Sequence, residues 1–163
     1  MCIRDRRIGC IASKNKQLTD HIMKLCQARL CVPYVEQIGA AALINAGNQN
    51  IKQTVEEYRK RRDTVVSELK KIEGVECQTP EGAFYFIIKL PVKNAEEFTR
   101  WILEEFSYNN ETILLCPASE FYAQNGKGAD EVRISYCISQ DELRRAMKIL
   151  SEGLKKYKET IAG

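Results

Sequence analysis

Two arginines are the residues of this chain best suited to bind a small acidic ligand. Arg133 lies in the run Val-Arg-Ile-Ser-Tyr at 132–136, which has the composition of a strand and follows a glycine-bearing loop. Burying a guanidinium without a partner is costly. Arg133 therefore either faces water, pairs within the chain, or holds a carboxylate or phosphate with its planar fork. Arg7 is the second candidate, because Gly9 lets the backbone approach a ligand closely.

The histidine, serine, lysine and cysteine side chains give weaker evidence of a functional site. His21 is the only histidine, so a metal site of several histidines is excluded, and its neighbours are those of an ordinary helix. Ser13 and Lys14 resemble part of a Ser-x-x-Lys or lysine Schiff-base site, but the polar turn around them favours a solvated lysine. The seven cysteines lack any Cys-x-x-Cys spacing. We expect them to be reduced, buried thiols that form neither a zinc site nor disulfides.

The composition is that of a soluble globular protein. Hydrophobic residues make up 44% of the 163 residues and charged residues 29%, which is close to the average for such domains. The net charge of +3, with both signs scattered, predicts no binding of nucleic acid or of an anionic membrane. The basic run at 59–62 is expected to be a solvated helix face. Because no apolar run reaches the roughly 20 residues of a membrane span and no signal peptide is evident, we expect a cytoplasmic protein.

The hydrophobic pattern predicts helices first, then alternating strands and helices. Helices are expected at about 16–28, 35–46 and 51–72, and two more should begin at the caps Asn94 and Ser139. Strands are expected at 7–12, 75–78, 83–90, 111–116 and 132–138, and residues 119–131 should form a loop. This order predicts an α/β or α+β fold in which helices cover a small mixed sheet. The helix at 51–72 is long enough to bridge two lobes.

Six motifs in this order resemble the class I aminotransferases of fold type I, which use pyridoxal 5′-phosphate (PLP). They are Arg-Ile-Gly at 7–9, the loop at Pro33, the long helix at 51–72, and the segments 80–85, 116–121 and 132–136. The resemblance covers nearly the whole chain and is closest to bacterial aspartate aminotransferases, through residues 105–110 and the loop at Pro117. It implies that 7–47 is a remnant of the large PLP-binding domain and that 48–163 is the C-terminal small domain.

The resemblance also gives three residues a role. Arg133 matches the arginine that binds the α-carboxylate of the amino-acid substrate. Arg7 matches the arginine that pairs with the PLP phosphate. Arg29 lies near the position from which dicarboxylate-specific members present an arginine to the active site of the partner subunit. The implied activity is transfer of an amino group between an amino acid, expected to be aspartate, and a 2-oxo acid, by a homodimer.

The chain departs from the family pattern at its beginning. The family's Schiff-base lysine lies several residues before the Arg-x-Gly motif, and no lysine occurs among residues 1–6. We therefore expect the C-terminal part of a longer enzyme, inactive by itself, with residues 1–6 as a non-native leader. The alternatives are a short protein that keeps the small domain for binding, a non-catalytic α/β interaction domain, or an aminotransferase specific for alanine, aromatic amino acids or diaminopimelate.

Overall fold

The computed structural model describes residues 2–3, 8–9, 11–29, 31–45 and 49–162. The chain divides into two compact units, Met1–Lys52 and Gln53–Gly163. The assignment of 7–47 and 48–163 to the large and small domains of an aminotransferase, and of 1–6 to a leader, stays a prediction. Among the described residues, no helix is both long and apolar enough to cross a membrane.

The first unit holds one short ribbon and two helices. Strand β1 (Cys2–Ile3) pairs antiparallel with β2 (Ile8–Gly9), and the helices are α1 (Lys16–Ala28) and α2 (Tyr34–Asn45). Helix α1 has its predicted bounds, because the Asn15 side chain caps it by accepting a hydrogen bond from the backbone N–H of Leu18 at 3.1 Å. The buried strand expected at 7–12 is wrong in its described part, since it is shorter and Ile11 is 66% exposed.

Helix α3 (Gln49–Leu69) begins in the first unit and continues into the second. It ends three residues before the predicted limit, and a turn follows in which Ile72 N–H donates to the Leu69 carbonyl at 3.0 Å. Gly74 then has φ +80°, and a Cβ there would lie 2.8 Å from Pro91. The helix is therefore followed by a turn that requires glycine at this position.

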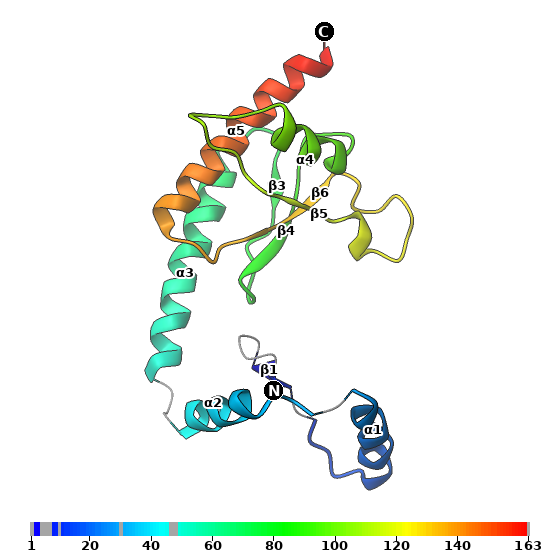
Figure 1. Ribbon diagram of the computed structural model, residues 1–163. Coiled ribbons are helices and arrows are strands. Elements are labelled where there is room, and N and C mark those ends of the chain that lie inside the picture. Colours follow the sequence, from blue (N-terminus) through cyan, green and yellow to red (C-terminus); the bar gives the residue numbers. More distant parts are fainter. Residues whose placement is uncertain (1, 4–7, 10, 30, 46–48, 163) are drawn as a thin grey trace. The chain divides into compact units, whose positions relative to one another are not determined.

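The second unit is built on a four-stranded antiparallel sheet (Figure 1). Its strands are β3 (Glu76–Cys77), β4 (Tyr85–Lys89), β5 (Cys116–Pro117) and β6 (Glu131–Ser135), in the order β3-β4-β6-β5. The expectation of a mixed sheet is wrong for the described strands. The pairs β3–β4 and β5–β6 are joined without an intervening α-helix, and neighbours joined in this way run antiparallel, because parallel neighbours need a crossover connection.

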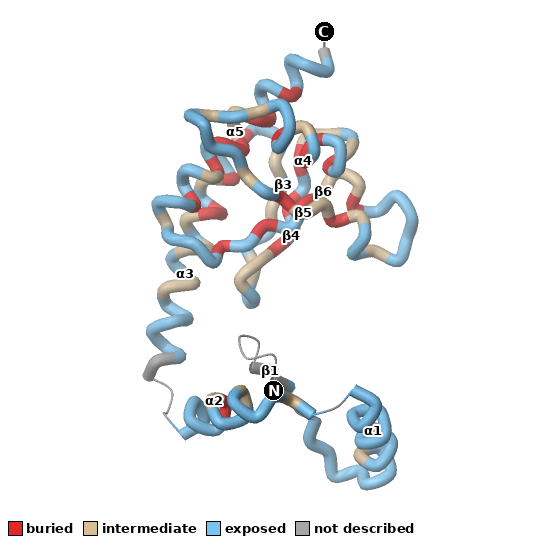
Figure 2. Tube along the Cα trace, in the orientation of Figure 1, coloured by how far each residue is buried: buried red, intermediate tan, exposed pale blue. Residues whose placement is uncertain are grey.

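The core of the second unit lies on one face of this sheet. Burial alternates along β4 and β6, so that Phe86, Ile88, Val132 and Ile134 point into the core. Further large core side chains come from helices α4 (Ala95–Glu104) and α5 (Gln140–Ala162) and from the C-terminal half of α3, and they include Val65, Leu69, Phe98, Ile102, Leu143 and Leu150. The buried positions gather between these helices and the strands (Figure 2).

The predicted caps of α4 and α5 are confirmed. Asn94 accepts hydrogen bonds from the N–H groups of Glu96 and Glu97 at 2.9 and 3.3 Å. The Ser139 hydroxyl and backbone N–H both donate to the Glu142 carboxylate, at 2.6 and 2.9 Å. These capping boxes satisfy backbone donors that would otherwise lack partners at the start of each helix.

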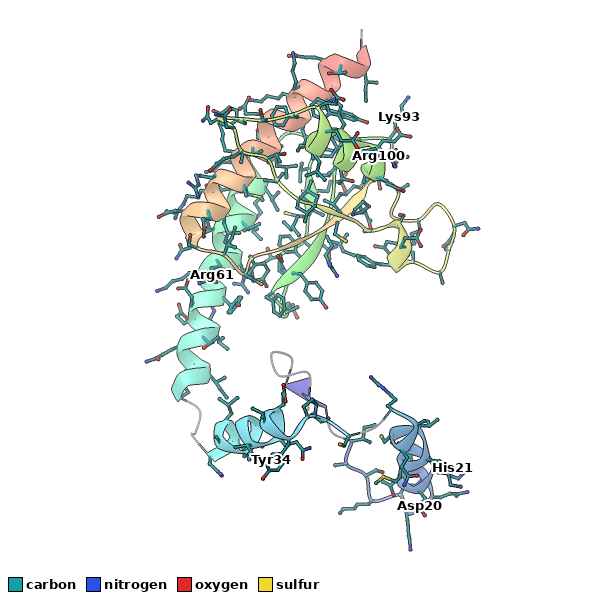
Figure 3. The ribbon with its side chains drawn as sticks, viewed as in Figure 1. Asp20, His21, Tyr34, Arg61, Lys93 and Arg100 are labelled. Carbon is teal, nitrogen blue, oxygen red and sulfur yellow. The ribbon has the colours of Figure 1, made fainter. Side chains whose placement is uncertain are left out.

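Two expectations about polar side chains are wrong. Among the described cysteines, Cys26, Cys31 and Cys137 are exposed rather than buried, while Cys77 and Cys116 are half-buried. The basic run at 59–62 is only partly solvated: Arg61 on α3 (Figure 3) donates to the Cys137 carbonyl at 2.7 Å. Arg62 is also half-buried, beside the carbonyl of Pro80. Both side chains tie α3 to loops at the ends of strands.

Candidate functional site

The face of the sheet opposite the core carries the candidate site. Arg133 on β6 stands directly across from Ile87 on β4 and from Cys116 on β5. Because side chains alternate along each strand, these three residues share the face that does not point into the core. We call it the open face, defined by the row Ile87, Arg133 and Cys116 together with Tyr85 and Ser135, which form the next pair on the same face.

The guanidinium of Arg133 is held by aromatic rings on this open face. Its Cζ lies over the Tyr85 ring at 5.5 Å from the centroid and over the Phe121 ring at 5.1 Å. Both distances are within the range of a cation–π contact. The side chain is exposed, which is one of the alternatives that the sequence left open for Arg133. A guanidinium that contacts aromatic rings keeps N–H donors for an acceptor, because it carries five of them.

No acidic side chain neutralises Arg133 within the described residues. The ion pairs formed there involve other arginines and lysines, and none reaches Arg133. Glu131, two residues earlier on β6, faces Lys89 in the register, and Asp130 pairs with Lys89 at 3.4 Å. Alternation places the Glu131 carboxylate on the same face as Arg133, but this carboxylate accepts the Tyr122 hydroxyl, and Asp130 is the acid paired with Lys89. Neither acid forms an ion pair with Arg133.

The turn that carries Phe121 is fixed to the beginning of β6. It is a 3₁₀ helix, η2 (Ser119–Phe121), in which the Phe121 N–H donates to the Ala118 carbonyl at 3.0 Å. The buried Ala118 donates its own N–H to the Glu131 carbonyl at 2.9 Å. Tyr122, the next residue after Phe121, donates its hydroxyl to the Glu131 carboxylate at 2.5 Å. We call these two bonds to Glu131 the latch.

Gly128 completes the latch. Its φ is +75°, and a Cβ at this position would lie 2.4 and 2.6 Å from two carbons of the Tyr122 ring. Only glycine lets the ring lie this close to the backbone. The hydrogen bond to the Glu131 carboxylate raises the pKa of Tyr122 above its ordinary value, so this phenol stays a donor at neutral pH.

The start of β4 is also held under strain next to the open face. Ala83 has φ +62°, in the left-handed region that residues with a Cβ seldom adopt. Its carbonyl accepts a 2.8 Å hydrogen bond from the hydroxyl of Tyr136, the residue that follows β6. Burial raises the pKa of Tyr136. This bond fixes the backbone two residues before Tyr85, and strain of this kind is concentrated at functional sites.

The other residues predicted for the site fall elsewhere. Arg29 is exposed at the C-terminal cap of α1, in the first unit, and Arg7 lies outside the described residues. His21 lies on α1 with its Nδ1 2.7 Å from the Gln17 carbonyl of the same helix, as expected for an ordinary helical histidine (Figure 3). Lys14 is exposed beside the start of α1. In the described parts of the chain, no group of His, Cys, Asp and Glu could hold a metal ion.

An open groove of about 930 Å³ adjoins this site at the edge of the sheet. It lies between the segment 111–117 and the first half of α5, and its lining includes Arg133, Cys116 and Arg145. Two site residues escaped the sequence analysis: Tyr85 and Phe121 stood inside motifs but had no role of their own. The available signal was an aromatic residue in each of the two motifs that precede the arginine strand.

Comparison with known proteins identifies the family. The family Aminotransferase class I and II matches residues 5–150. The chain is 28% identical over 152 residues to an aspartate aminotransferase of Sulfurisphaera tokodaii, covering 90% of this chain and 36% of that protein. It is 32% identical over 130 residues to an aspartate aminotransferase of Musicola paradisiaca, covering 76% of this chain and 30% of that protein. The chain thus spans about a third of the length of these relatives.

Solved structures agree with this match. An α-aminoadipate aminotransferase of Thermus thermophilus superposes with a TM-score of 0.78 at 22% identity, over 93% of this chain and 39% of that one. The aspartate aminotransferase of Rhizobium meliloti superposes with a TM-score of 0.62 at 28% identity, over 79% of this chain and 33% of that one. The likeness to the Thermus enzyme shows the fold. The match to the family covers residues 5–150. This chain therefore belongs to the class I and II aminotransferases.

Proposed function

We propose that this chain is the substrate-binding C-terminal part of a PLP-dependent aminotransferase, and that Arg133 binds the α-carboxylate of the amino acid. The observation that carries the proposal is the Arg133 guanidinium, which stands on the open face with no acidic partner among the described residues. A planar fork of this kind binds a carboxylate through two parallel charge-assisted hydrogen bonds. The amino acid and the 2-oxo acid of a transamination both carry such a carboxylate.

The charge of Arg133 favours an anionic ligand over a neutral one. Bringing a carboxylate to Arg133 joins two opposite charges, and the aromatic rings beside the guanidinium keep part of the surrounding water away. Fixing one end of the substrate limits how its Cα can be oriented. Orientation of this kind can supply about 7–11 kcal/mol of a reaction barrier. Arg133 would therefore contribute to turnover as well as to affinity.

We include PLP as the cofactor because the chain belongs to the class I and II aminotransferases. The structure of the α-aminoadipate aminotransferase is a complex with N-(5′-phosphopyridoxyl)-L-leucine. The chemistry that PLP supplies when bound is an electron sink for the Cα of the amino acid. The described residues fit the substrate side of such a site, because they offer a guanidinium fork for a carboxylate. Arg7, proposed to pair with the cofactor phosphate, lies outside the described residues. We expect the Schiff-base lysine to lie in a part of the enzyme beyond these 163 residues.

The proposed substrate is aspartate, with the enzyme acting as a cytoplasmic homodimer. Support comes from the relatives in Sulfurisphaera and Musicola, which are named aspartate aminotransferases. In this proposal Arg29 binds the second carboxylate of the substrate in the active site of the partner subunit. The solved structures also include an archaeal alanine:glyoxylate aminotransferase, so an enzyme specific for another amino acid is the second candidate.

A chimeric enzyme tests this proposal. Residues of this chain replace the matching stretch of the Musicola enzyme, and amino transfer from L-aspartate to 2-oxoglutarate is measured. We expect activity, and we expect Arg133→Lys to raise KM and to lower kcat/KM. Losing one charge-assisted hydrogen bond costs about 1.5–3 kcal/mol, which corresponds to roughly 10- to 150-fold in kcat/KM.

The control is Arg144→Lys, because Arg144 is exposed on α5 and pairs only with Asp141 one turn earlier. An active chimera whose Arg133→Lys variant behaves like the Arg144→Lys variant would remove Arg133 from substrate binding. Activity with L-alanine but not with L-aspartate would favour the second candidate. A non-catalytic interaction domain predicts that a folded chimera, checked by circular dichroism, has no activity with any amino donor.

A further inference from the structure

We propose that Phe121 is a positioning residue for Arg133: held by the latch to β6, its ring fixes the guanidinium in the orientation that receives a carboxylate. This inference rests on the proposed role of Arg133. Phe121 lies 12 positions before Arg133 and on a different element, η2 rather than β6. The loop 118–130 returns onto β6 and brings the two residues together. It makes the loop a part of the site rather than a connection between strands.

The position of the Phe121 ring is not explained by core packing. The side chain is 48% exposed and does not belong to the buried cluster of the second unit. Its only ring or cation contact among the described residues is with Arg133, at 5.1 Å. An aromatic ring left half in water usually has little reason to be fixed in one place. Here the backbone on both sides of it is tied down, which indicates that the placement of the ring matters.

The latch acts on the residues that flank Phe121. On one side, Ala118 is fully buried and donates to the Glu131 carbonyl. On the other side, the Tyr122 ring rests on Gly128 and its hydroxyl binds the Glu131 carboxylate. Glu131 lies on the same strand as Arg133. The segment that carries the Phe121 ring and the residue that carries the guanidinium are therefore both attached to β6. The backbone of Phe121 cannot move far from β6 without breaking a bond of the latch.

Fixing the guanidinium has a direct consequence for binding. A free arginine side chain loses rotamer freedom when it forms a bidentate pair, and that loss weakens binding. A ring beside the guanidinium restricts those rotamers before the ligand arrives. The guanidinium carries five N–H donors, so donors remain for the carboxylate beside the ring contact. Phe121 would thus strengthen binding without touching the ligand.

The test compares variants of the 163-residue chain by nuclear magnetic resonance of the Arg133 Nε–Hε group. Phe121→Leu removes the ring but keeps an apolar side chain, and Phe121→Tyr keeps the ring. The matched control is Lys127→Ala, which removes a cation–π contact from the same loop, the one between Lys127 and the Tyr122 ring at 5.0 Å. Each variant is titrated with L-aspartate and with succinate, and the mobility of Arg133 is measured by relaxation of the same resonance.

We expect Phe121→Leu to shift the Arg133 resonance by loss of the ring current, to make the side chain more mobile, and to weaken binding of L-aspartate about two- to fivefold. That factor is the equilibrium equivalent of an exposed cation–π contact. Phe121→Tyr should restore all three properties, and Lys127→Ala should leave them unchanged. A ring that only stabilises the loop would not give this rescue together with a change confined to Arg133.

The outcomes separate this inference from the proposed function. Binding of L-aspartate to Arg133 that is equally strong in wild type and Phe121→Leu, with unchanged Arg133 mobility, overturns the inference and leaves the proposed function standing. Absence of L-aspartate and succinate binding to the wild-type chain counts against the role of Arg133 itself. In that case, unaltered mobility of Arg133 in Phe121→Leu would overturn the inference as well. Mobility of Arg133 that rises in Phe121→Leu and stays at the wild-type level in Phe121→Tyr would uphold the claim that the ring positions Arg133.

Discussion

Replacing Gly128 by alanine should destabilise the second unit much more than the same change at Gly126. Both glycines lie in the loop before β6 and both have positive φ, +75° at Gly128 and +81° at Gly126. Alanine in the left-handed region costs about 1–2 kcal/mol at either position. The surroundings differ: nothing lies within 4 Å of a Cβ at Gly126, whereas a Cβ at Gly128 would meet the Tyr122 ring at 2.4 Å.

The additional loss at Gly128 comes from overpacking. The ring cannot stay in place beside a methyl group, and forcing an extra carbon into a packed site costs typically about 1–3 kcal/mol. We therefore expect Gly126→Ala to lower the free energy of unfolding by about 1–2 kcal/mol and Gly128→Ala to lower it by about 2–5 kcal/mol. Displacing Tyr122 would also open the latch, so Gly128→Ala should increase the mobility of Arg133 while Gly126→Ala should not.

Urea unfolding followed by tryptophan fluorescence measures this difference. Trp101 is the only tryptophan in the chain, and its ring lies 5.0 Å from that of Tyr157 and 5.5 Å from that of Phe106 in the second unit. For urea slopes of about 1–3 kcal/mol/M, an extra 2 kcal/mol lowers the midpoint by roughly 1 M. Equal midpoints for the two alanine variants would refute the close packing of Tyr122 on Gly128, and with it the latch.

Three further outcomes follow from the core, the caps and the open face. Phe98→Ala, at a fully buried position against helix α5 residues, should cost about 3–5 kcal/mol of unfolding free energy, and a loss below 1 kcal/mol in the same urea assay would contradict the proposed core. The hydrogen bonds from Ser139 lower the pKa of Glu142, so the stability that this carboxylate provides is present above its ordinary pKa of about 4.3 and is lost as pH falls through the lower folded value. Thermal melts between neutral and acidic pH should show a smaller decline for Glu142→Gln than for the wild type, and identical declines would speak against the cap. Because Cys116 stands across from Arg133 on the open face, L-aspartate should slow its alkylation by iodoacetamide, as read by peptide mass spectrometry, and unchanged alkylation at saturating L-aspartate would contradict the shared site.

The helices could be predicted because their signals are local. The capping residues Asn94 and Ser139 each stand three places before a glutamate, and both helices begin where these pairs place them. The stop at Gly74 is equally local, since a positive φ there requires glycine. The helix ends are harder to predict. Ile72 fits the apolar pattern of α3 and is buried, but it lies in the turn that follows the helix, which ends at Leu69.

The pairing of strands and the environment of the site could not be predicted in the same way. The register that sets Arg133 opposite Ile87 and Cys116 joins residues far apart in the chain, and hydrophobic alternation alone does not choose between parallel and antiparallel neighbours. The sequence left open whether Arg133 is exposed or bound, and the side chain is exposed while it contacts the rings of Tyr85 and Phe121. Phe121 reaches it through a loop without periodicity, where pattern analysis has nothing to measure.

The binding of a carboxylate by Arg133 is tested most directly by a crystal structure of the chain grown with L-aspartate. The account predicts a carboxylate on the open face, in the plane of the guanidinium, with its two oxygens about 2.7–2.9 Å from two Arg133 nitrogens, and with the Phe121 ring still beside Cζ. L-aspartate bound away from Arg133, or an Arg133 side chain turned off the open face at saturating L-aspartate, would contradict it.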